Sequence, residues 1–228
     1  MKFFALLKYE LRICLPWLLL CTLAFTVIGS ILMKGILLNQ SNYINQGYYE
    51  NYSYYFFASY GPIREFGPLI LMISLALGVI LAVAQFFLPG VFKTWPFTLH
   101  RSIRPQMILW SKFTAATVTF VVSLGLIWTL FYAYAAVPGR LYLPVFFTTY
   151  LEGWIYILTG LIAYWGTALS SVSTAYIYTT RMLGLAVATG AIFLVLLQTS
   201  ITGAALWAAA GAGVLIIQLF DTFLSREY

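Results

Sequence analysis

Apolar residues occupy long, almost uninterrupted stretches of this chain. A helix needs about 20 mostly apolar residues to cross the hydrocarbon core of a bilayer. Six stretches meet or approach this length, at residues 15–33, 67–87, 113–135, 146–169, 182–197 and 204–220. The pattern therefore predicts an all-α membrane protein with six transmembrane helices.

The segments between these stretches differ strongly in length. A long polar external loop is predicted at residues 34–66, and a cytoplasmic loop at residues 91–112. The last two spans are separated only by residues 198–203, which are polar and small. We expect these two spans to form a tight helical hairpin.

The N-terminal residues 2–14 carry a different pattern, with an apolar stripe and a basic face at helical spacing. The stripe comprises Phe4, Leu7, Leu11 and Cys14, and the basic face comprises Lys8 and Arg12. Short basic amphipathic helices of this kind lie in the membrane interface. Pro16 would end the helix, because proline cannot continue the hydrogen-bond ladder. We therefore expect an interfacial elbow helix; the alternative is a plain start to the first span, with basic side chains reaching the headgroups.

Composition supports lipid as the solvent for these helices. The 228 residues are 62% hydrophobic and 8% charged, whereas a soluble domain carries about 25% charged residues. The net charge of +6 comes from too few basic residues for a phosphate-binding face, so we expect no nucleic-acid partner. Cys14 and Cys21 lie seven residues apart in one apolar helix, too far apart to bridge, and are read as apolar helix residues.

Basic residues set the orientation of the bundle. With a cytoplasmic N-terminus, the inside segments hold nine of them: Lys2, Lys8, Arg12, Lys93, Arg101, Arg104, Lys112, Arg181 and Arg226. The outside segments hold three: Lys34, Arg64 and Arg140. The positive-inside rule favours this orientation. It places both termini in the cytoplasm and the chain in a cell membrane, such as a bacterial inner membrane or a plasma membrane.

The cytoplasmic loop has features of a docking element. It holds four of the nine inside basic residues and the single histidine, His100, together with several apolar side chains. Pro96 suits the first position of a helix, and Pro105 would limit that helix. A helix of about two turns on the membrane surface fits between them. Such an element suits a soluble partner; a positively charged loop without a partner is the alternative.

Two further features are candidates for external or substrate contacts. Seven of the 17 tyrosines lie in the external loop, among them Tyr54 and Tyr55. Glu152 lies near the outer end of the fourth span, and acidic groups in membrane segments are costly and often functional. The alternatives are a loop that packs on the bundle and a carboxylate with a structural role.

Small residues repeat every four positions in the last two spans, at Gly184 and Ala188 and at Ala204, Ala208 and Ala212. This spacing lets helix backbones approach closely in lipid. We expect an intramolecular helix contact, with a dimer interface as the alternative.

Motifs for catalysis are missing from the sequence. It has no phosphate-binding loop, no His-Glu-x-x-His motif and no pair of intramembrane carboxylates. We therefore expect a chain that is not itself an enzyme and holds no cofactor or metal.

Taken together, the elbow helix, six spans, cytosolic loop and closing hairpin resemble the membrane subunit of an ABC transporter of the type-2 exporter class. The segment Phe97-Thr-Leu-His-Arg-Ser-Ile-Arg104, followed by Lys112, is similar to that family's loop between spans two and three. The opening from Phe4 to Arg12 is also similar to the family's usual start. The long first external loop and the short connection between spans five and six depart from the family pattern.

The resemblance implies a division of labour. Permeases of this family work as pairs, identical or related, and each binds a separate ATPase subunit that holds ATP and magnesium. It also implies that a coupling helix sits in the ATPase, here Phe97, Thr98, Leu99, His100, Arg101, Ser102 and Ile103. An ion-gradient-driven carrier and a non-transporting membrane anchor or sensor are the alternative functions.

Overall fold

The fold is described from a computed structural model of the whole chain, which describes residues 2–45, 63, 65–92, 104–141, 145–173 and 182–225. These residues form helices and no strands. In chain order the elements are α1 (Lys2–Asn45), α3 (Phe66–Ala82), the π-helix η2 (Val83–Phe87), α4 (Leu88–Val91), α6 (Pro105–Phe120), the π-helix η3 (Val121–Gly125), α7 (Leu126–Ala135), α8 (Phe147–Val172), α9 (Leu183–Leu197) and α10 (Ile201–Leu224).

Five helical rods in the described ranges are long and apolar enough to cross a membrane. They are Phe3–Leu38, Phe66–Val91, Pro105–Ala135, Phe147–Val172 and Ile201–Leu224. The sixth apolar helix, α9, has 15 residues and extends only about 22 Å at 1.5 Å per residue. The structure thus confirms, over the described ranges, an all-helical architecture with five to six apolar helices of membrane-spanning length, as expected of a multi-pass membrane protein.

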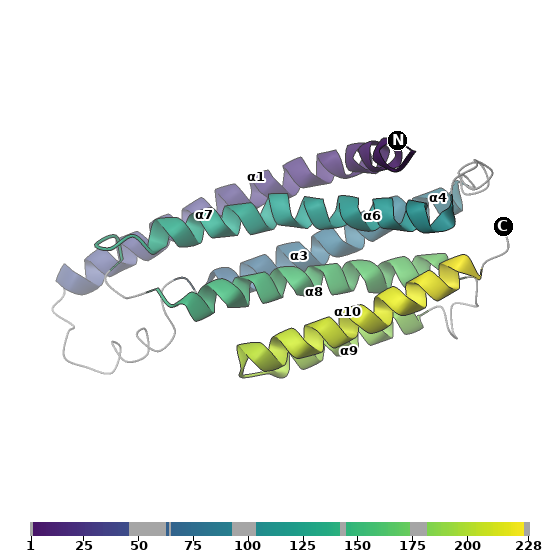
Figure 1. Cartoon of the computed structure of the whole chain (residues 1–228). Coiled ribbons are helices and arrows are strands. Elements are labelled where there is room, and N and C mark those ends of the chain that lie inside the picture. Colours follow the sequence, from purple (N-terminus) through teal and green to yellow (C-terminus); the bar gives the residue numbers. More distant parts are fainter. Residues whose placement is uncertain are drawn as a thin grey trace.

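The helices run side by side along one long axis (Figure 1). α8 is the central element, because it packs against α3, α9 and α10, while α1 packs mainly on α6. The start of α1, the short helix α4, the start of α6 and the end of α10 all lie at the same end of the bundle (Figure 1). We call this the α4–α6 end. The end of α1, the end of α7 and the start of α8 lie at the opposite end.

The elbow predicted over residues 2–14 is wrong as a separate element. α1 is one helix of 44 residues, and Pro16 lies inside it. A proline in a helix interior removes one backbone hydrogen bond and often kinks the helix. In an apolar setting, a helix that ended at Pro16 would leave several backbone groups without hydrogen bonds. A helix that continues past Pro16 lacks only one backbone hydrogen bond, so the continuous helix costs less free energy.

Both predicted loops are shorter than the sequence suggested. Residues 34–45 of the predicted external loop continue α1, and residues 46–62 lie outside the described part. The predicted cytoplasmic loop loses residues 105–112 to α6, which begins with Pro105 in its first turn. Proline suits this position because the first N–H of a helix has no partner inside the helix.

Small residues bring the helices into backbone contact. A Cβ added at Gly78 of α3 would collide with the Gly160 carbonyl of α8. Gly166 of α8 meets Gly184 and Ala188 of α9 in the same way. The small residues of the fifth span thus make an intramolecular contact, as expected from their spacing.

Candidate functional site: a buried polar junction

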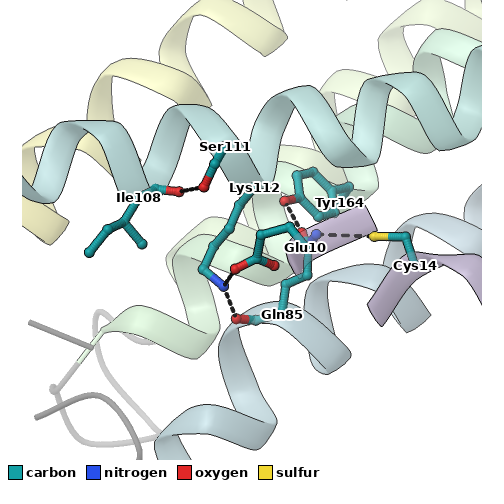
Figure 2. Close-up of polar contacts among 7 residues, drawn as sticks. All are labelled: Glu10, Cys14, Gln85, Ile108, Ser111, Lys112 and Tyr164. Carbon is teal, nitrogen blue, oxygen red and sulfur yellow. Dashed lines mark hydrogen bonds and ion pairs between the residues drawn. The ribbon is translucent and has the colours of Figure 1, made fainter. Parts of the chain in front are cut away.

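Five polar side chains meet inside the apolar bundle, near its α4–α6 end (Figure 2). They are Glu10 and Cys14 of α1, Gln85 of η2, Lys112 of α6 and Tyr164 of α8. None of them is more than 5% exposed. We call this set the polar junction. It joins four elements that lie far apart in the sequence.

The polar junction contains a buried ion pair. Lys112 Nζ donates to Glu10 Oε1 at 2.7 Å, which holds α6 to the N-terminal part of α1. Removing one partner of a buried pair typically costs about 3–5 kcal/mol, because the other charge is left uncompensated. The pair therefore stabilises the packing of α1 against α6.

Lys112 has a second acceptor, the Gln85 carbonyl oxygen, at 3.0 Å. In an α-helix this carbonyl would accept the N–H of residue 89, but residue 89 is proline and has no N–H. The ammonium group also lies 5.4 Å from the centre of the Phe86 ring, within the range of a cation–π contact. Proline at position 89 thus creates an acceptor site that the lysine fills.

The Gln85 side chain connects the remaining members. Its Nε2 donates to Cys14 Sγ at 3.2 Å, and its Oε1 accepts from Tyr164 Oη at 2.5 Å. Gln85 lies in a π-helical turn, where the Leu88 N–H bonds to the Val83 carbonyl. Such π-turns are rare and frequently occur at functional sites. Gln85 is therefore the centre of the junction, with α1 on one side and α8 on the other.

Sequence reasoning missed this site. Glu10 falls within the predicted elbow helix and Lys112 within the predicted cytoplasmic loop, yet both lie inside the helix bundle. A local signal exists for each. Glu10 lies three residues after Leu7 and four before Cys14, on the apolar stripe. Lys112 lies four residues after Ile108, which is also buried. A charge on an apolar stripe predicts a buried partner.

The predicted site residues have mixed outcomes. The proposed coupling residues Phe97–Ile103 and the external Tyr54 and Tyr55 lie outside the described residues. Glu152 is half-buried near the start of α8. On α1, the side chains of Phe4, Lys8 and Arg12 are exposed, whereas Leu7 and Leu11 pack partly against the core.

The two cysteines are free and buried, as expected. Cys14 is more than an apolar filler, because its sulfur accepts the hydrogen bond from Gln85. Across the described ranges, no three His, Cys, Asp or Glu side chains gather as a metal site. What the junction offers chemically is one ionisable pair, held among neutral hydrogen-bonding groups.

The fold and the polar junction define a multi-pass, all-helical membrane protein with a buried ion pair between its first helix and α6. No protein-family model, curated protein or solved structure matches the sequence.

Proposed function

We propose that this chain is the membrane-spanning permease subunit of an ATP-driven exporter of the ABC class. A separate ATPase subunit, which carries ATP and magnesium, binds the segment between α4 and α6, with Phe97–Ile103 as the contact. A second permease chain, identical or related, completes the pathway. The chain itself performs no catalysis, and both of its termini face the cytoplasm of the cell membrane.

One observation carries this proposal: the two helices that flank the α4–α6 connection are bonded to each other through Lys112. The lysine belongs to α6, and the carbonyl that it contacts belongs to η2, directly before α4. The same lysine is paired with Glu10 of α1. A push on the connection is therefore passed to three helices together, which is what a motor-driven permease requires.

The distribution of exposed basic residues supports a cytoplasmic location for the α4–α6 end. Lys8, Arg12 and Arg104 are exposed and belong to the helix starts at the α4–α6 end. Exposed basic groups next to a membrane span favour the cytoplasmic side.

Copurification tests the proposal directly. The tagged full chain, extracted in mild detergent, is expected to retain a partner with a phosphate-binding loop and ATPase activity, identified by mass spectrometry. Leu99→Asp with Arg101→Glu is expected to remove the partner, because it places charge on the apolar contact and reverses the basic one. The matched control, Lys34→Glu with Arg140→Glu at the opposite end, is expected to keep it. Retention of the partner by the first variant, or absence of an ATPase from the native chain, contradicts the proposal.

An ion-gradient-driven carrier is the second candidate, because the Glu10–Lys112 pair places an ionisable carboxylate inside the bundle. Intramembrane acidic residues mark ion and proton pathways in many carriers. Liposomes distinguish the two functions. A carrier moves substrate under an ion gradient without ATP, and an exporter needs the ATPase and ATP. A partner without any flux would indicate an anchor or sensor.

A further inference from the structure

Glu10 and Lys112 are held very unequally within the polar junction. Glu10 Oε1 accepts from Lys112, but Glu10 Oε2 is buried and has no hydrogen-bond partner among the described residues. A buried carboxylate oxygen without a donor costs free energy, because it has given up its water. The carboxylate therefore relies on Lys112 alone for stabilisation of its charge.

The lysine has contacts that persist without the carboxylate. The Gln85 carbonyl accepts from it at 3.0 Å, and the Phe86 ring lies 5.4 Å away. Both contacts favour the protonated ammonium group. A proton taken up by this pair therefore adds to the Glu10 carboxylate, because Lys112 is already protonated.

The other ionisable groups around Glu10 do not compete for the proton. Cys14 on its own helix and Tyr164 on α8 interact electrostatically with it. Both side chains are neutral near neutral pH. η2 contributes the amide of Gln85, which does not titrate, and α6 contributes Lys112.

Glu10 also lies close to the end of the bundle. It is eight residues after Lys2, the first residue of α1, so it is about 12 Å along the helix from that end. Lys112 is seven residues after Pro105, about 10 Å from the start of α6. A proton from water at the α4–α6 end thus has a short distance to travel, and no other reactant is needed.

We propose that Glu10 is a proton-binding site and that proton uptake loosens α1 from α6. A proton from water adds to the unpartnered Oε2, and the carboxyl group becomes neutral. The ionic attraction to Lys112 is lost, while Lys112 keeps its contacts with Gln85 and Phe86. α1 then loses its charged contact with α6. The proposal does not depend on the exporter function, because it concerns this chain alone.

Infrared difference spectroscopy of the full chain in nanodiscs tests proton binding. The sample is acidified in steps, and the carboxyl region of the spectrum is recorded at each step. The native chain is expected to gain the C=O band of a protonated carboxyl group. Glu10→Gln is expected to lose this response, and the matched control Glu152→Gln, which changes a half-buried carboxylate on α8, is expected to keep it. A response that survives in Glu10→Gln, or no band in the native chain, overturns the proposal.

A distance measurement tests the movement of α1 and needs no change at Glu10. Spin labels at Ala5→Cys on α1 and Met107→Cys on α6 occupy exposed positions near the junction. The parent chain, whose two cysteines are buried, serves as the labelling blank. Acidification is expected to lengthen and broaden the label distance, and Glu10→Gln is expected to give the acid-like distribution at neutral pH. An unchanged distance across the pH range overturns the release of α1.

Discussion

Inside an apolar bundle, the charges of Glu10 and Lys112 compensate each other. Taking either ion out of water is costly, and only a close partner with good hydrogen-bond geometry offsets that cost. The 2.7 Å contact and the Gln85 carbonyl provide this for the lysine. The same physics predicts that losing one charge is worse than losing both.

A double-mutant cycle measures this dependence. Lys112→Met is expected to lower the stability by about 3–5 kcal/mol, because Glu10 is left as an isolated buried carboxylate. Glu10→Leu is expected to cost less, because Lys112 keeps the Gln85 carbonyl and the Phe86 ring as partners. The double variant is expected to cost clearly less than the sum of the two single changes. Thermal unfolding in detergent, followed by the loss of monodisperse protein, provides the comparison.

Lys8→Met is the control for this cycle. It removes a lysine from the same helix, but the Lys8 side chain is exposed. Its effect is expected to stay within about 0.5 kcal/mol. Purely additive single changes at Glu10 and Lys112 would show that the pair contributes no coupling.

At the scale of elements, the bundle is held by close backbone approach as much as by side-chain packing. The α3–α8 crossing shows this most clearly, since Gly160 faces the Ser74 carbonyl and Ser74 Oγ donates to the Tyr156 carbonyl at 2.8 Å. In lipid, where apolar side chains gain little from leaving the solvent, such packing drives helix association.

Two glycine-to-alanine changes are expected to have opposite signs. In Gly160→Ala the new Cβ collides with the Ser74 backbone, so the helices must separate at a cost of about 1–3 kcal/mol. At Gly190 of α9, an added methyl group would have no atom of another residue within 4 Å. Gly190→Ala is expected to stabilise by about 0.5–1 kcal/mol, since alanine favours the helix. The melting temperature is measured for each variant and compared with that of the native chain. A shift in the same direction for both variants would contradict the close backbone contact at the α3–α8 crossing.

Helix positions were predictable where polar or turn-forming residues bound the apolar run. The predicted spans 146–169 and 182–197 correspond to α8 (Phe147–Val172) and α9 (Leu183–Leu197). The prediction failed at Pro16 and at residues 34–45, where local signals for a break and a loop were overridden by a continuous α1. Tertiary packing decides such cases, and a local pattern does not contain it.

The site was less predictable than the fold for a similar reason. Glu10 and Lys112 are 102 residues apart, and nothing in either local segment names the other as its partner. The Gln85 carbonyl is still harder to foresee, because its availability depends on Pro89 and on the π-helical turn η2. Each charge on an apolar stripe signalled burial, but only the three-dimensional arrangement identifies the pair.

At the scale of the whole molecule, the rods differ in length far more than a uniform bilayer requires. α1 has 44 residues, about 66 Å, whereas the hydrocarbon core is about 30 Å thick. α1 and α7 extend beyond the start of α8 at the end opposite α4–α6 (Figure 1). α9, at about 22 Å, is shorter than the core, so a crossing by α9 would require local thinning of the bilayer.

Cysteine labelling from outside intact cells tests both the orientation and the crossing of α9. The native cysteines are buried, so single cysteines introduced at exposed positions report alone. Arg104→Cys and Ser225→Cys lie at the α4–α6 end, and both are expected to react with an impermeant maleimide only after permeabilisation. Arg140→Cys, beyond α7, is expected to react in intact cells.

Thr199→Cys, at an exposed position in the turn between α9 and α10, decides the number of spans. If Thr199→Cys reacts from outside, α9 and α10 both cross the bilayer. If Thr199→Cys is protected while Arg140→Cys reacts, the short α9–α10 hairpin ends within the bilayer. Labelling of Arg104→Cys from outside would show that the bundle has the opposite orientation. The α4–α6 connection would then lie out of reach of any cytoplasmic ATPase.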